Sequence, residues 1–170
     1  MLKQILVHGN CLSVGDQGVL LLGPSGSGKS DLTLRLIDQP GCGVTGVLKR
    51  AQLVADDQVI VRLVAGRLIA SAPPAIAGLI EIRGLGIAGL PYRREVALAI
   101  AVRLRAQPAI ERLPDLEKNR YEIFGKPLPV LEIDAASASA PARIRAAVDR
   151  LTSGESGLHG DDDRGMVRVF

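Results

Sequence analysis

The sequence has 170 residues, of which 47% are hydrophobic, 23% are charged and only 2% are aromatic, and its formal net charge is +3. A chain of this size and apolar content folds around a core, which excludes an intrinsically disordered protein. Binding of single-stranded nucleic acid needs aromatic stacking platforms, so we expect no nucleic-acid partner. The core must be built from aliphatic side chains, which is typical of the buried strands of α/β proteins.

The sequence also predicts a location. Cys11 and Cys42 lack the spacing of a metal site, and we expect both thiols to be buried and reduced. The first residues lack the apolar core of an export signal. No apolar run approaches the roughly 20 residues that span a membrane. We therefore expect a cytoplasmic protein with no membrane partner.

Hydrophobic patterning predicts many short strands and few helices. In chain order we expect strands at residues 5–7 and 19–22, a helix at 29–38, strands at 52–55, 59–64, 67–70, 79–82, 95–103 and 130–133, and a C-terminal helix.

Three finer expectations concern these elements. Alternation in the strand at 95–103 places Val96, Leu98, Ile100 and Val102 on one face. Ala65 and Gly66 form the tight turn of a hairpin between the strands at 59–64 and 67–70. Ser139 caps the last helix, whose remaining markers are Pro141 in the first turn, an apolar stripe of Ile144, Val148 and Leu151, and Gly154 beyond its end.

Residues 23–30 match the pattern G-x-x-x-x-G-K-S/T between an aliphatic strand and a helix. The glycines let the backbone curl so that successive N–H groups face phosphate oxygens, and the helix adds its positive end. A chance match in a flexible loop is the alternative. The predicted nucleotide-binding residues are Gly23, Pro24, Ser25, Gly26, Ser27, Gly28, Lys29 and Ser30, with Lys29 on the β- and γ-phosphates and Ser30 on Mg²⁺.

Two acidic residues, Asp56 and Asp57, follow the strand at 52–55. Carboxyl ends of strands hold active-site residues in α/β sheets. Neighbouring side chains at a strand end diverge, so one aspartate is expected to accept a proton from a hydroxyl nucleophile and the other to orient metal, water or backbone. The residues do not say which is which. An Asp-rich turn that opens the next hairpin is the alternative.

Glu81 and Arg83 lie two residues apart on a strand and therefore project from one face. Together they suit a metal and a phosphate, or they form an exposed ion pair of little energetic weight. His8 stands near the end of the first strand, where it is either a structural residue or an acid–base group.

Four segments in this order resemble the catalytic domain of the HPr kinase/phosphorylase family: His8-Gly9, residues 23–30, residues 54–57 and residues 81–87. The last segment is the family's signature and is more specific than the glycine-rich loop. The likeness covers residues 5–90 and resembles short forms that contain only the C-terminal catalytic domain. The segment at 41–52 is longer than is usual in the family, and the C-terminal region is shorter.

The resemblance implies a serine kinase that transfers the γ-phosphoryl group of ATP, with Mg²⁺, to the phosphocarrier protein HPr. It also implies a weaker reverse activity in which inorganic phosphate attacks phosphoserine and releases pyrophosphate. Because members of the family form hexamers, the resemblance leaves open a homo-oligomer of this chain. The implied catalytic residues are His8, Lys29, Asp56, Asp57, Arg83 and Arg143, the last from a basic loop, and the implied metal ligands are Ser30 and Glu81.

We therefore expect a single α/β P-loop domain on a mixed, largely central sheet with few helices. It should span residues 1–152, with a flexible tail at 153–170. A small-molecule kinase on the same core is a second hypothesis, but no arginine-rich lid is visible. A non-catalytic nucleotide sensor is a third, and the acidic residues Asp56, Asp57 and Glu81 argue against it.

Overall fold

The computed structural model describes residues 3–112 and 118–153, so most of the expected tail lies outside the described residues. The strands are β1 (Gln4–His8), β2 (Asn10–Val14), β3 (Gln17–Leu22), β4 (Ala51–Ala55), β5 (Gln58–Val64), β6 (Arg67–Ser71), β7 (Leu79–Ile82), β8 (Gly86–Gly89), β9 (Glu95–Leu104), β10 (Arg120–Ile123) and β11 (Lys126–Ile133). The helices are α1 (Lys29–Asp38), α2 (Ala140–Ser153) and two 3₁₀ turns, η1 (Pro74–Ile76) and η2 (Gln107–Ala109).

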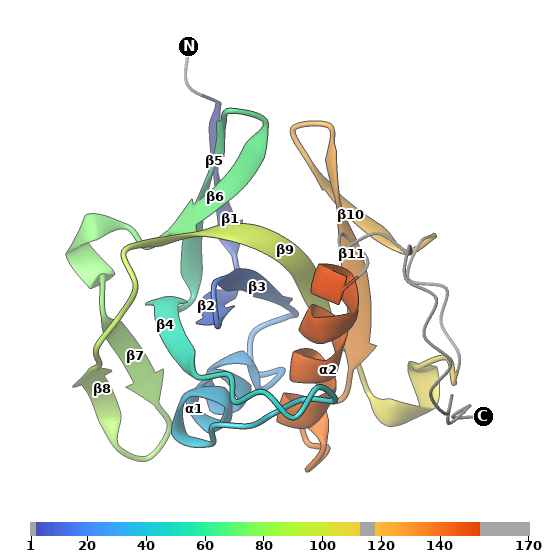
Figure 1. Ribbon diagram of the computed structural model, residues 1–170. Coiled ribbons are helices and arrows are strands. Elements are labelled where there is room, and N and C mark those ends of the chain that lie inside the picture. The colour runs from blue at the N-terminus through green and yellow to red at the C-terminus, as the bar shows by residue number, and fades with distance from the viewer. Residues whose placement is uncertain (1–2, 113–117, 154–170) are drawn as a thin grey trace.

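Nine strands form one mixed sheet in the order β1-β5-β6-β9-β3-β2-β4, to which β11 adds on β9 and β10 on β11. The long strand β9 joins its parts, because it pairs parallel with β3 and β11 and antiparallel with β6. Figure 1 shows β9 arching over both helices, with the separate hairpin β7–β8 to one side. The predicted α/β fold on a mixed sheet with few helices is confirmed. No helix within the described ranges is long and apolar enough to cross a membrane.

The two faces of the sheet carry separate apolar clusters. One contains Leu32 and Leu36 of α1 together with Ile144 and Val148 of α2, all buried, and Leu151 packs against it. This arrangement confirms the predicted stripe of the last helix. The other cluster fills the curl of the sheet with side chains from all nine of its strands. The helices thus cover one face, and the curled strands cover the other.

The expectation that alternate residues of β9 share one face is wrong. Ile100 and Val102 lie in the cluster beneath the helices, whereas Val96 and Leu98 belong to the opposite cluster. The cause is an irregularity in the β3–β9 ladder, where the register shifts between Gly18 and Val19. An extra residue on one strand turns the following side chains to the other face.

Strands β2, β8 and β10 were not predicted from the hydrophobic pattern. Strand β2 follows β1 after only one residue, Gly9, and its five residues are all buried, including Asn10 and Ser13. The expectation that both cysteines are buried is wrong for Cys42, which is exposed, whereas Cys11 is buried. Burial raises the pKa of the Cys11 thiol, so it stays protonated.

Buried charges on α2 hold the segment between α1 and β4. The Arg145 guanidinium donates to the carbonyl oxygens of Leu36 at 2.9 Å, Gln39 at 2.5 Å and Lys49 at 3.2 Å. Asp149 is ion-paired with Lys49 and accepts the N–H of Val44. Burial alone would raise the pKa of Asp149, but the hydrogen bonds and charge of Lys49 and the Val44 N–H lower it overall.

We expect Asp149→Asn to lower the free energy of unfolding at neutral pH by about 3 kcal/mol, because it removes one partner of a buried ion pair. A carboxylate with a depressed pKa stabilises the fold above its unfolded pKa, and this contribution is lost as the pH falls through its folded pKa. The difference in the free energy of unfolding between wild type and variant should therefore become smaller at acid pH. Urea unfolding across pH measures it, and Asp16→Asn, which alters an exposed pair with Arg93, is the control. A difference independent of pH would contradict this account.

Candidate active site

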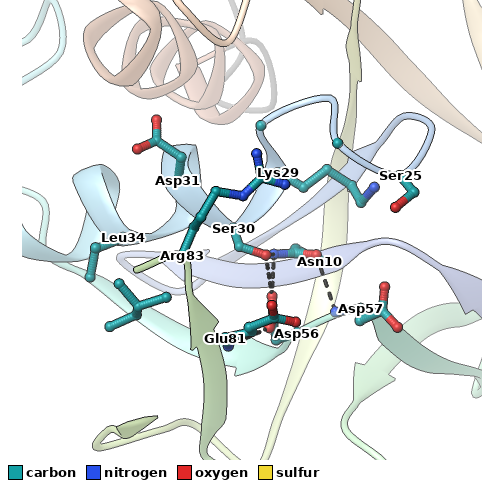
Figure 2. A pocket seen from close by; sticks show the side chains of 13 residues that line it. Asn10, Ser25, Lys29, Ser30, Asp31, Leu34, Asp56, Asp57, Glu81 and Arg83 are labelled. Carbon is teal, nitrogen blue, oxygen red and sulfur yellow. Dashed lines mark hydrogen bonds between the residues drawn. The ribbon is translucent and has the colours of Figure 1, made fainter. Parts of the chain in front are cut away.

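A pocket of about 550 Å³ lies where β2, β4, β7 and the start of α1 meet the loop at residues 23–30. Most of the predicted site residues line it (Figure 2). The polar side chains that line it are those of Asn10, Ser25, Lys29, Ser30, Asp31, Asp56, Asp57, Glu81 and Arg83.

The loop at residues 23–30 depends on its glycines. Gly26 and Gly28 have φ angles of 78° and 92°, in the left-handed region that favours glycine. A Cβ on Gly23 would lie 2.6 Å from the Ser27 hydroxyl oxygen, so a side chain there would displace the loop. Gly28 also precedes the first turn of α1, whose N–H groups and dipole favour an anion. The backbone shape therefore suits phosphate.

Lys29 lies along this loop with only 6% of its surface exposed. Its ammonium group donates to the carbonyl oxygens of Gly23 at 2.8 Å and Pro24 at 2.9 Å. Burial lowers the pKa of Lys29, and the negative charges of Asp57 and Asp56 act in the opposite direction. An ammonium group has three donors, so one remains for an anion in the pocket.

Asp56 is buried at the end of β4, with 8% of its surface exposed. Its Oδ1 accepts hydrogen bonds from the Ser30 hydroxyl at 2.9 Å and the Asn10 amide at 2.6 Å. Its Oδ2 accepts the backbone N–H of Glu81 at 3.0 Å. One carboxylate therefore connects β4 with β2, α1 and β7.

Asp57 has the opposite environment. Its side chain is 65% exposed, and its Oδ1 lies 3.3 Å from Nδ1 of His8. The residue is left-handed, with φ 62°, and its N–H donates to Oδ1 of Asn10 at 3.1 Å. The structure thus separates the two aspartates, one buried against Ser30 and one open to solvent beside His8.

His8 reaches Asp57 through the joint between β1 and β2. The N–H of Gly9 donates to the Asp57 carbonyl oxygen at 3.0 Å. A Cβ on Gly9 would lie 2.6 Å from the Leu21 carbonyl oxygen, so only glycine permits this approach. His8 itself is not among the residues that line the pocket, and its side chain meets the site at Asp57.

Glu81 and Arg83 both line the pocket from the hairpin β7–β8. In Figure 2 the Arg83 side chain extends from the end of β7 across the pocket toward the start of α1. Within the described ranges these two residues form no ion pair with each other, which disfavours the exposed ion-pair alternative. The backbone of Glu81 is fixed by Asp56, so its position depends on the buried carboxylate.

Arg143 is not brought into the pocket. It lies in the first turn of α2, where its backbone N–H donates to the Ser139 carbonyl oxygen at 2.9 Å. Asn10, by contrast, stands at the centre of the site and was missed. The signal in the sequence was a polar residue directly after His8-Gly9. Its burial became apparent only with β2, because without that strand it looks like an ordinary loop residue.

The donor set suits a hard cation. The Ser30 hydroxyl and the carboxylates of Asp56 and Glu81 provide oxygen ligands around one pocket. In the described part of the chain no group of three or more His, Cys, Asp or Glu side chains is arranged to hold a metal. Mg²⁺ commonly binds through one or two carboxylates plus substrate phosphates, so these residues fit Mg²⁺ bound with a nucleotide.

Comparison with known proteins gives a consistent result. Residues 1–161 match the family model of the HPr serine kinase C-terminal domain. An HPr kinase/phosphorylase of Cupriavidus metallidurans is 35% identical over 156 residues, which are 85% of this chain and 45% of that protein. One of Burkholderia cenocepacia is 36% identical over 153 residues, or 84% and 44% of the two chains.

A solved structure supports the same assignment. The Hpr(Ser) kinase/phosphatase from Coxiella burnetii superposes with a TM-score of 0.73 and 25% sequence identity, over 90% of this chain and 99% of that chain. This chain spans slightly less than half the length of the curated relatives that it matches. The family model nevertheless covers nearly all of it, so the chain belongs to the family of the HPr serine kinase C-terminal domain.

Proposed function

We propose that this protein is an ATP-dependent protein-serine kinase that transfers the γ-phosphoryl group to a serine of HPr. The observation that carries the proposal is the contrast between two adjacent aspartates in one pocket. Asp56 is buried against Ser30, while Asp57 is exposed beside His8. A phosphotransferase needs one acidic group on the metal side and one that is open to the incoming hydroxyl.

The nucleotide phosphates are held by the loop at residues 23–30, the first turn of α1 and the Lys29 ammonium group. Ser30, Asp56 and Glu81 would hold Mg²⁺, which supplies charge neutralisation to the β- and γ-phosphates when bound. Because the Ser30 hydroxyl donates to Asp56 Oδ1 and accepts only from the Asn10 amide, one lone pair of its oxygen is left for a metal ion. The two residues are thus arranged before a ligand arrives.

Transfer then needs a base and a cation. The serine oxygen bonds to the γ-phosphorus while the bond to the bridging oxygen breaks and ADP leaves with the electron pair. The serine proton passes to the Asp57 carboxylate, which His8 orients from 3.3 Å. Arg83 reaches across the pocket and offsets charge on the moving phosphoryl group.

The surroundings of the pocket favour a protein acceptor over a small molecule. Asp57 is largely exposed, so a serine on another protein reaches it without a closed cavity. On the adjoining hairpin, Leu85 and Ile87 are each 75% exposed, and Ile87 pairs with Glu81 across the strands. Exposed apolar side chains beside a site are typical of a surface that meets a protein.

The reverse reaction uses the same groups. An oxygen of inorganic phosphate in the loop attacks the phosphoserine phosphorus, the serine oxygen leaves with a proton from Asp57, and pyrophosphate forms. The loop binds phosphate through backbone N–H groups whether or not a nucleotide is attached.

Both cysteines are free, which supports a reducing compartment, and we propose the cytoplasm as the location of the protein.

The first test is transfer of labelled γ-phosphate from ATP to purified HPr. We expect transfer by the wild type and none by Lys29→Ala, because that change removes the cation at the phosphates. Lys126→Ala, at the exposed start of β11, is the matched control and should retain activity. Binding of ATP without transfer would favour a nucleotide sensor, and transfer to a small molecule alone would favour the second hypothesis.

The second test separates the aspartates. Asp57→Asn keeps the shape but removes the base, so kcat should fall by about 10²-fold or more with little change in the Mg²⁺ requirement. Asp56→Asn places an amide where three donors already converge, so the Mg²⁺ requirement should rise. Steady-state rates over a Mg²⁺ titration measure both. The reverse pattern would exchange the roles assigned here.

The third test concerns direction. Incubation of phosphoserine-HPr with the protein, Mg²⁺ and inorganic phosphate should release pyrophosphate at a rate below that of the kinase reaction. The acid–base group and the phosphate-binding loop serve both directions. The rate should be lower because the phosphoryl group of phosphoserine-HPr and inorganic phosphate compete for the same loop. Dephosphorylation without added phosphate would point to hydrolysis instead and would remove the phosphorylase half of the proposal.

A further inference from the structure

Asn10 connects the two aspartates of the site. It stands at the start of β2 with 0% of its surface exposed. Its Nδ2 donates to Oδ1 of Asp56 at 2.6 Å, and its Oδ1 accepts the backbone N–H of Asp57 at 3.1 Å. In the part of the chain that the structure describes, no other side chain hydrogen-bonds to both of these residues.

The orientation of the Asn10 amide is fixed by its surroundings. Nδ2 also lies 3.2 Å from the Thr33 hydroxyl oxygen and 3.3 Å from that of Ser30. The Thr33 hydroxyl donates to the Lys29 carbonyl oxygen at 2.8 Å, so it presents a lone pair to Asn10. The NH₂ group therefore faces Thr33 and Asp56, and the amide oxygen faces the N–H of Asp57.

Resting on the proposed function, we propose that Asn10 is the positioning residue for phosphoryl transfer. Its donor end directs Asp56 so that Oδ1 meets the Ser30 hydroxyl. Its acceptor end holds the backbone of Asp57 in the left-handed conformation that turns its carboxylate toward His8. A single amide thus fixes the position of the metal-side carboxylate relative to that of the acid–base carboxylate.

Asparagine can make both hydrogen bonds at this position, whereas aspartate, serine and alanine cannot. Aspartate has the same shape but no donor, and it would set a second carboxylate against Asp56, 2.6 Å from Oδ1. Serine and alanine are too short to reach both partners. Asn10→Asp keeps the volume and the acceptor oxygen, so this substitution tests the donor end of the amide.

The test measures the metal site apart from catalysis. Mn²⁺ is titrated into the ADP complex and followed by electron paramagnetic resonance, and ADP binding without metal is measured by calorimetry. For Asn10→Ala we expect Mn²⁺ affinity to fall by about 10-fold or more, as when other supporting residues of metal sites are removed. ADP affinity without metal should be unchanged, because Lys29 and the loop keep their contacts.

Kinetics complete the comparison. For Asn10→Ala, kcat should fall by about 10²-fold while KM for HPr changes little, because small misplacements of reacting groups have effects of that size. Asn10→Asp should not restore either readout. Ser13→Ala is the matched control, because Ser13 is buried in the same strand and its hydroxyl has no hydrogen-bond partner among the described residues. It should behave as the wild type.

Three outcomes would overturn the proposal: unchanged Mn²⁺ affinity and kcat in Asn10→Ala, near-normal behaviour of Asn10→Asp, or an equal loss in Ser13→Ala. Circular dichroism verifies folding, and Asn10→Ser replaces Asn10→Ala should the latter not fold. Failure of the proposed function is distinguishable. A wild type that binds Mn²⁺ with ADP but does not phosphorylate HPr would refute the kinase, while the metal titration would still judge Asn10.

Discussion

The buried carboxylate of Asp56 is the constraint on which the site depends. A charge with 8% exposure is unfavourable unless it is fully hydrogen-bonded. Its partners come from three other elements: Asn10 of β2, Ser30 of α1 and the backbone of Glu81 in β7. Satisfying this one group therefore brings the start of α1, the joint after β1 and the hairpin β7–β8 to the end of β4. The pocket is the space that these segments enclose.

Adjacent aspartates can have different roles because the chain turns between them. Asp56 still follows the direction of β4, while Asp57 adopts a left-handed conformation with φ 62°. Non-glycine residues adopt this conformation with some strain, although Asp tolerates it better than most. Here the Asp57 N–H bond to Asn10 and the Gly9 N–H bond to the Asp57 carbonyl oxygen hold the turn. Divergence of the side chains then follows from backbone geometry.

Local patterns predicted what local physics determines. The helix at 29–38, the hairpin of β5 and β6 and the glycine-rich loop follow from periodicity and glycine placement, and the structure has them. Long-range registers are not visible in the sequence. Strand β2 contains buried Asn10 and Ser13, so its pattern does not resemble a core strand until Asp56 and α1 are placed beside it. The reversal of faces in β9 likewise arises from its pairing with β3. Which aspartate is buried and which is exposed depends on where β2 and α1 lie, so the sequence did not assign the two environments.

The end of β4 and Asp56, which follows it, also hold the segment that contains Arg83. The hairpin β7–β8 is a separate two-stranded sheet, so ladder hydrogen bonds to the main sheet do not fix it. Instead, the Glu81 N–H bonds to Asp56, and the Arg93 N–H bonds to the Leu53 carbonyl oxygen at 2.8 Å. Buried Ile80 packs the inner side of the hairpin. These two hydrogen bonds hold the segment that contains the hairpin against β4 and Asp56. The carboxylate that accepts from Ser30 therefore also anchors the strand that leads to Arg83.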